Sequence, residues 1–375
     1  MSQNIRDFVP ATCALLAFGE PTHGEPAFAR VRNELFAQLV DCGFRSVTIE
    51  TDRVAALAVD DFVRNGVGTL QQVMDEGFSH GLGKLDANRQ LVTWMHEYNA
   101  TRTEDQRLSF HGFDAPTEMT SAPSPRHYLE CARDYLGVDI DLAGLTGDDE
   151  QWSRVEAIMD AAASPGATAE AERLRVVADD MLTMLYARAP ELIAATSHAE
   201  WITADTHLTA GLGLLRYHKQ SADRQIDETT RVSRMLAVRD ALMAQNLLAI
   251  RRAEAARGAT FVFAQNGHLR RDRCHWSLAG MDLTWFSAGA ITDSLLGERY
   301  CFVAGSLGQS TILGLGVPEP DTYEGLLSSR IKTWGLTTPA TLGPARRRTD
   351  PTPEQGYFPL DRATLDGADA VLHIA

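Results

Sequence analysis

The sequence predicts an α/β fold in which a mostly parallel central sheet is flanked by helices, with a large helical insertion forming part of the active-site cleft. Three observations predict this fold. Strand-like and helix-like segments alternate over residues 1–115, the pattern is helical over 116–256, and strand-like runs return over 257–375. We therefore expect one integrated domain, in which the two outer parts form the halves of one core and the middle part is inserted between them.

The first part of the chain shows the alternation most clearly. Short apolar or β-branched runs predict strands over residues 14–18, 46–50 and 108–113. After each of the first two strands, apolar residues recur every three or four positions, which is typical of the buried face of a helix. These predicted helices cover residues 25–40, 53–64 and 86–99.

The remaining elements follow a proline-containing loop over residues 115–126. Apolar residues at helical spacing predict long helices over 168–188 and 230–256. A strand is expected over 259–264, just before Gln265-Asn266-Gly267-His268. Further strand-like runs cover residues 299–303, 310–313 and 370–374.

Composition excludes several classes of function. The formal net charge of -15 is a poor match for nucleic acid, since neutralising phosphates requires clustered Lys and Arg. Five cysteines, an odd number without a CxxC pair, argue against a disulfide framework and favour a reducing compartment. The chain shows neither a secretory signal pattern nor an apolar run long enough to span a membrane. We expect a cytoplasmic protein that acts on a small molecule, without nucleic-acid or membrane partners.

Polar residues follow four of the predicted strands. In α/β sheets, ligands bind beyond the carboxyl ends of the strands, so parallel and adjacent strands would bring these residues to one rim. They are Glu20 and His23 after the first strand, Glu50 and Asp52 after the second, His111 and Asp114 in and after the third, and Asn266 and His268 after the fourth.

The segment Gly19-Glu20-Pro21-Thr22-His23-Gly24-Glu25 is the strongest local feature. A histidine at a strand-to-helix turn, close to two glutamates, is well placed for general-base catalysis, because a neighbouring carboxylate orients the imidazole and stabilises its protonated form. The alternative interpretation is that the two glutamates cap the following helix and that His23 is a solvated loop residue.

Each of the other candidates also has a structural alternative. Glu50 ends a run that should be buried, so it faces either a cleft or a salt-bridge partner such as Arg53. His268 lies in a glycine-containing turn, where a structural hydrogen bond is an alternative, and Asp114 could simply terminate its strand. Arg239 shares an apolar helix face with Asn246, which predicts contact with a buried acid or a substrate, or else a plain salt bridge.

The same segments resemble the erythromycin esterase family. The resemblance covers less than a quarter of the residues, but the matching stretches occur in the order of the family and include a G-E-x-x-H-G motif with an arginine nine residues after the histidine. The stretches are GEPTHGEPAFARVR (19–32), GFRSVTIETD (43–52), FHGFD (110–114), VRDALMAQNLLAI (238–250), FVFAQNGHLRRD (261–272) and LDGADAVLHIA (365–375).

This resemblance implies a metal-independent and cofactor-independent hydrolase that opens macrolide lactones with water activated by a histidine. By motif position, His23 resembles that base, Glu20 and Glu50 the surrounding acids, and Arg32 the arginine of the same cleft. His268 resembles the second histidine of the family's H-N-x-H segment. The sequence departs from that pattern at Gln265, which stands where the macrolide esterases have the first histidine and cannot relay a proton at neutral pH.

We therefore expect hydrolysis of an ester or lactone of a natural product, with His23, Glu50, Glu20 and His268 as catalytic residues. Arg32, Asp114, Gln265, Asn266 and Arg239 are expected to bind the substrate. Three alternatives stay open. The protein is a biosynthetic enzyme that hydrolyses or cyclises a non-macrolide intermediate, a hydrolase with a divalent metal held by His23 and the nearby carboxylates, or a binding protein without activity.

Overall fold

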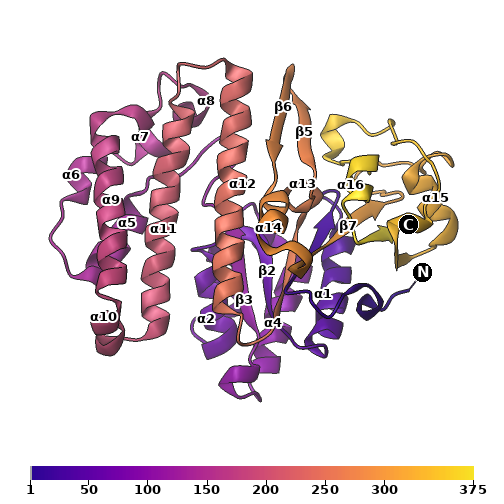
Figure 1. The fold of residues 1–375 in the computed structure, drawn as a ribbon, viewed down its shortest axis with the longest axis horizontal. Helices are drawn as coiled ribbons and strands as arrows, with labels where there is room; N and C mark the ends of the chain where they lie inside the picture. Colours follow the sequence, from indigo (N-terminus) through magenta and orange to yellow (C-terminus); the bar gives the residue numbers. More distant parts are fainter. Residues whose placement is uncertain (1) are drawn as a thin grey trace.

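A seven-stranded sheet forms the centre of the computed structural model, which describes residues 2–375 (Figure 1). Its strands are β1 (Leu15–Glu20), β2 (Phe44–Asp52), β3 (Ser109–Asp114), β4 (Ala259–Gln265), β7 (Tyr300–Leu307), β8 (Trp334–Thr337) and β9 (Ala370–Ile374). The order across the sheet is β3-β2-β4-β1-β7-β9-β8. All neighbours pair in parallel except β8, which runs antiparallel to β9 at one edge.

Helices cover both faces of the sheet because successive strand residues point to opposite faces. In β1, Leu16 and Phe18 pack into one core while Leu15 and Ala17 pack into the other. The first core is covered by α1 (Pro26–Val40), α2 (Ala56–Asn65), α3 (Leu70–Glu76) and α4 (Asp86–Asn99). The second is covered by α12 (Glu228–Ala253), α13 (Asn266–Leu269), α14 (Ala288–Leu296), α15 (Tyr323–Arg330) and α16 (Arg362–Asp366).

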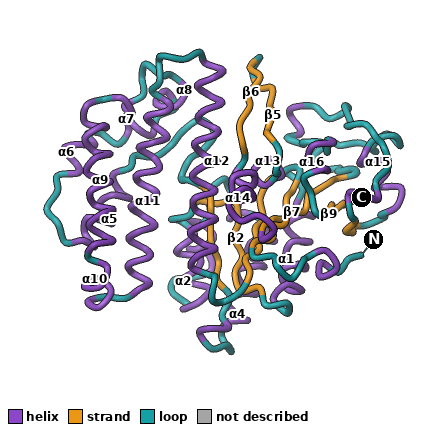
Figure 2. The backbone as a smooth tube through the Cα atoms, viewed as in Figure 1, coloured by secondary structure: helices purple, strands orange, loops and turns teal. Residues whose placement is uncertain are grey.

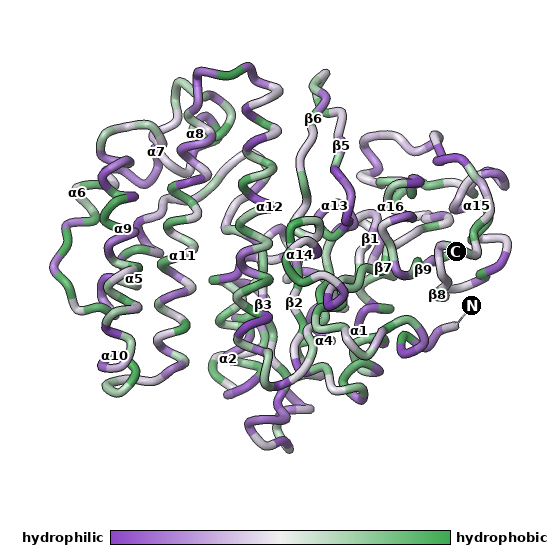
Figure 3. Tube along the Cα trace, viewed as in Figure 1, coloured by the Kyte–Doolittle hydropathy of each residue, from purple (hydrophilic) through white to green (hydrophobic). Residues whose placement is uncertain are grey.

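The chain between β3 and β4 is helical and begins with a bundle that has an apolar core of its own. Figure 3 shows hydrophobic and hydrophilic residues alternating along its helices, as expected where one face of each helix is buried. The last helix of the segment, α12, contacts both the bundle and β3. The bundle consists of α5 (Arg126–Leu136), α6 (Leu142–Thr146), α7 (Glu150–Ser153), α8 (Glu156–Met159), α9 (Ala169–Ala187), α10 (Ala189–Ala195) and α11 (His198–Ser221).

A separate hairpin follows α13 and projects away from the sheet (Figure 2). It is formed by β5 (Arg273–Leu278) and β6 (Met281–Phe286), which pair antiparallel. Apolar residues of the hairpin pack against α12, so this helix holds the hairpin in place. Within the part of the chain that the structure describes, no helix combines the length and the apolar character needed to cross a membrane.

The predicted α/β fold with its helical insertion is confirmed. One local prediction is wrong, because residues 310–313 form a turn and not a strand. The backbones of Ser310 and Leu315 pair across this turn, and the Ser310 hydroxyl accepts a hydrogen bond from the Leu313 N–H. Gly314, with a φ of 62°, allows the sharp reversal. The predicted division into three parts is not tested by the topology alone and stays a prediction.

One side chain links the end of β4 to β7 across the strand between them, β1. Asn266, just after β4, hydrogen-bonds both the N–H and the carbonyl of Gly305 on β7, at 2.9 and 2.8 Å. Since β1 lies between β4 and β7, the amide passes over β1 at Gly19. A Cβ atom at Gly19 would lie 2.1 Å from the Asn266 Oδ1 atom, so the glycine before Glu20 leaves the space that this tie requires.

We expect Gly19→Ala to destabilise the protein by about 1–3 kcal/mol, the usual cost of overpacking a rigid core. Denaturant unfolding followed by circular dichroism measures this change. Gly316→Ala is the matched control, because no heavy atom lies within 4 Å of its new Cβ position. Equal unfolding free energies for the two variants would contradict the role of the tie.

Candidate active site

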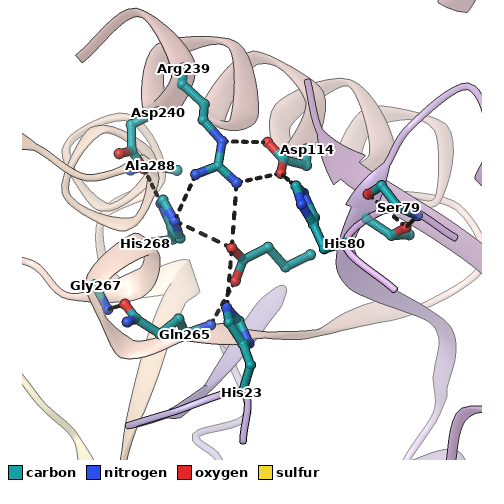
Figure 4. A network of polar contacts seen from close by, with 12 residues as sticks. His23, Ser79, His80, Asp114, Arg239, Asp240, Gln265, Gly267, His268 and Ala288 are labelled. Carbon is teal, nitrogen blue, oxygen red and sulfur yellow. Dashed lines mark hydrogen bonds and ion pairs between the residues drawn. The ribbon is translucent and has the colours of Figure 1, made fainter. Parts of the chain in front are cut away.

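The ends of β1, β2, β3 and β4 meet, and each supplies a residue to one polar network (Figure 4). Glu20 ends β1, and His23 follows in the loop before α1. Glu50 lies near the end of β2, and Asp114 ends β3. His268 lies in the short helix α13 after β4, and Arg239 reaches the same place from α12.

Glu50 is buried at the centre of this network. Its Oε1 atom lies 3.3 Å from His268 Nε2, 3.6 Å from Arg239 Nη2 and 3.8 Å from His23 Nε2. Its Oε2 atom accepts a hydrogen bond of 2.8 Å from the backbone N–H of Gln265. Burial raises the pKa of Glu50, but these three cationic neighbours outweigh burial and hold the pKa below its usual value. The carboxylate is therefore ionised at neutral pH.

His23 is oriented by the other acid of its motif. Its Nδ1 atom lies 2.7 Å from Oε1 of Glu20, which is buried, while its own side chain is 47% exposed. Loss of hydration lowers the pKa of His23, but Glu50 and then Glu20 outweigh this effect and raise the pKa to about 9. Burial raises the pKa of Glu20 against the opposing effect of His23. Below pH 9 the Glu20–His23 pair therefore holds one proton, and the two side chains interact strongly.

His268 is held from behind by Asp240, a buried residue of α12. The Asp240 carboxylate accepts hydrogen bonds from Trp285 Nε1 at 2.6 Å and from the Ala288 N–H at 2.9 Å, and it lies 2.8 Å from His268 Nδ1. Burial lowers the pKa of His268, but Asp240 and Glu50 raise it above its usual value. The ring is thus fixed with Nε2 directed at Glu50.

Arg239 and Asp114 form a buried, bidentate ion pair. Arg239 Nε donates to Asp114 Oδ1 at 3.1 Å, and Nη2 donates to Oδ2 at 2.5 Å. Burial raises the pKa of Asp114, but Arg239 and His80 outweigh it and hold the pKa well below its usual range. The remaining guanidinium nitrogen, Nη1, lies 3.4 Å from His268 Nε2. One arginine therefore links the ends of β2, β3 and β4.

His80 is a member of the network that the sequence interpretation did not include. Its Nε2 atom lies 2.8 Å from Asp114 Oδ2, and its Nδ1 atom lies 2.8 Å from Glu118 Oε2. It occupies a loop after α3 with a φ of 55°, which is uncommon outside glycine. A histidine between Ser79 and Gly81 is a recognisable polar loop signal, but only the tertiary fold shows that this loop reaches the end of β3.

Arg32 lies next to the network, in a narrow pocket between the sheet and α1. Its guanidinium is fully buried, donates to Asn33 and Asn88, and stacks over the Phe263 ring at 4.9 Å. Burial lowers the pKa of Arg32 to about 9, against an opposing effect of Glu20. The pocket is lined by residues that include Glu20, His23, Arg32, Glu50, Asn88 and Phe263.

Two other predicted residues make mainly structural contacts. The Gln265 side chain accepts a hydrogen bond from the Gly267 N–H at 2.9 Å and so caps α13. The Asn266 amide is engaged with Gly305, as described above. The substrate-binding roles of both residues stay predictions.

The network residues do not form a compact set of metal ligands. The two ring nitrogens of His23 face different carboxylates, Glu20 and Glu50. Within residues 2–375, a group of at least three His, Cys or carboxylate side chains whose ligating atoms all lie within 4.8 Å of one another occurs only in the helical segment.

Comparison with known proteins identifies one family. The model of the family described as Erythromycin esterase matches residues 39–367, beginning after the segment with Glu20, His23 and Arg32. No curated protein sequence matches the chain.

Solved structures are similar to the chain over nearly its whole length. A protein from Bacillus cereus is 16% identical, covers 100% of this chain and 92% of its own, and has a TM-score of 0.70. A mutant of the erythromycin esterase EreC in its open conformation is 18% identical, with 97% and 90% covered and a TM-score of 0.66. A succinoglycan biosynthesis protein is 15% identical, with 99% and 89% covered and a TM-score of 0.66. At these identities the likeness establishes the fold alone.

Proposed function

Because the chain belongs to the erythromycin esterase family, we propose that it is an esterase-like hydrolase that cleaves an ester or lactone with water activated by His23. The family supports the reaction class. The residue roles rest on the geometry around Glu50, and the expected substrate is a small natural product.

The observation that carries this proposal is the orientation of His23. Glu20 engages Nδ1 at 2.7 Å, so Nε2 is the nitrogen that faces Glu50. The distance of 3.8 Å between Nε2 and Glu50 Oε1 is too long for a direct hydrogen bond but suits a water molecule that contacts both atoms. In the proposed step, neutral His23 removes a proton from this water, and the resulting hydroxide attacks the carbonyl carbon of the substrate.

The surrounding cations provide donors for the negative charge that develops on the carbonyl oxygen. His268, Arg239 and Arg32 are held rigidly by their own partners, and preorganised donors stabilise a transition state without reorganisation at the moment of reaction. The proton then passes from His23 to the leaving alkoxide. The reaction is a balanced hydrolysis, in which the acyl–oxygen bond breaks, water adds across it, and no co-reactant is required.

Gln265 favours a substrate other than a macrolide. It stands where the sequence pattern of the macrolide esterases has a histidine, and its side-chain oxygen is engaged by Gly267. A glutamine at this place cannot exchange a proton with the substrate. A biosynthetic hydrolase or cyclase that uses the same site is therefore the second candidate. Failure of a panel of simple esters, lactones and macrolides, together with consumption of a pathway intermediate, would favour it.

We expect His23→Ala to reduce kcat about 10²–10⁴-fold on any ester or lactone that the protein hydrolyses, which is the usual contribution of a general base. The melting temperature should change little because the side chain is half-exposed. His275→Ala, at an exposed histidine of the hairpin, is the control. Near-native turnover by the His23 variant would overturn the assignment of the base.

The activity should rise with pH toward the pKa of the Glu20–His23 pair. The raised pKa of about 9 means that the neutral base forms only as pH increases, so kcat/KM should climb between pH 7 and 9. Glu20→Gln removes one of the two negative charges that raise this pKa and should shift the rising limb to lower pH. A profile that falls between pH 7 and 9 would instead indicate that protonated His23 acts as an acid.

A further inference from the structure

A second cluster of reactive side chains lies in the helical bundle, on elements that the candidate active site does not use. His127 and Cys131 lie on α5, and His207 lies on α11. One ligating atom from each, two imidazole nitrogens and a thiol sulfur, lie within 4.8 Å of one another. We propose that these three residues bind Zn²⁺.

The two helices hold the three side chains at a fixed place. The spacing of four residues between His127 and Cys131 puts both on the same face of α5, one turn apart. On α11, Gly211 lies one turn after His207 and packs directly on α5, where an added Cβ would lie 2.7 Å from Leu129. The glycine therefore permits a close approach of the helices, which lie side by side in Figure 1. This approach brings His207 opposite the other two residues.

The hydrogen bond of His207 prepares it as a ligand. Its Nδ1 atom lies 2.8 Å from the carbonyl oxygen of Thr203, which has no hydrogen to donate, so Nδ1 carries the proton. The other nitrogen, Nε2, is then the unprotonated one that can bind a metal. A backbone carbonyl behind a histidine in this way is the usual arrangement at metal sites, because it fixes both the tautomer and the ring orientation.

The distances are close to those of a zinc site. The Cys131 sulfur lies 3.9 and 4.0 Å from the two ring nitrogens of His127. Tetrahedral Zn²⁺ with its normal bond lengths holds neighbouring N and S ligands about 3.6 Å apart. Binding of the ion therefore requires the His127 nitrogen and the Cys131 sulfur to approach by only about 0.3 Å. His127 is exposed and the other two residues are partly exposed, so an ion can enter and a water can take the fourth position.

The donor set selects the kind of metal. Two imidazoles and one thiolate suit borderline and soft ions such as Zn²⁺, whereas Mg²⁺ and Ca²⁺ prefer oxygen ligands. A bound ion would join α5 to α11 and so brace the bundle against separation of these two helices. The inference does not depend on the proposed hydrolysis, since none of its residues belongs to the network around Glu50.

The test measures metal binding to the full chain after treatment with a chelator and desalting. Zn²⁺ is titrated in competition with a chromophoric chelator, and Co²⁺ is added separately because thiolate ligation gives a charge-transfer band in the near ultraviolet. Cys131→Ala, His207→Ala and His127→Ala remove one ligand each. The double variant Cys42→Ala/His198→Ala is the control, because it removes an exposed cysteine and an exposed histidine elsewhere.

We expect one equivalent of Zn²⁺ per chain and a thiolate band with Co²⁺ in the wild type and in the control. Each ligand variant should weaken Zn²⁺ binding at least about tenfold. Removing a residue that only hydrogen-bonds a metal ligand already costs about this much, and removing the ligand itself should cost no less. Cys131→Ala should also abolish the band. His127→Ala keeps the test valid if a variant at the other two positions fails to fold. Unchanged Zn²⁺ binding in Cys131→Ala, or loss of binding in His23→Ala instead, would overturn the proposal.

Discussion

One oxygen atom of a buried carboxylate, Oε1 of Glu50, is the point on which the candidate active site depends. Three cationic side chains from separate parts of the chain, His23, Arg239 and His268, lie within 3.3–3.8 Å of it. In a buried site, uncompensated positive charges of this kind repel one another strongly. The negative charge of Glu50 offsets that repulsion, so the three groups can lie close together. It also raises the pKa of His23 and of His268.

The positive charges are balanced beyond this shared contact, because each of the three cationic groups also contacts a second acid. These partners are Glu20 for His23, Asp240 for His268 and Asp114 for Arg239. This second acid fixes the orientation of each group. The Glu50 carboxylate, which all three groups contact, brings them close to one another. Such an arrangement is costly to bury for stability alone and is typical of sites that perform acid–base chemistry.

The sequence predicted which polar residues would lie together at the strand ends, although their roles stay predictions. The runs before Glu20 and Glu50 are apolar enough to mark buried parallel strands, and polar groups at the ends of such strands share one rim. His80 and Asp240 were missed for a physical reason, since a loop and a helix bring them in through tertiary packing that no local pattern encodes. The turn over residues 310–313 was mistaken for a strand because β-branched residues also occur in turns closed by a positive-φ glycine.

The most direct test of the central role of Glu50 is the pKa of the His23 ring, measured by NMR titration in the wild type and in Glu50→Gln. The substitution keeps the size of the side chain and removes its charge. The account predicts a value near 9 in the wild type and a clear fall toward 6.5 in the variant, with Glu20 still supporting part of the elevation. An unchanged pKa in the variant would show that Glu50 does not control His23 and would contradict the account.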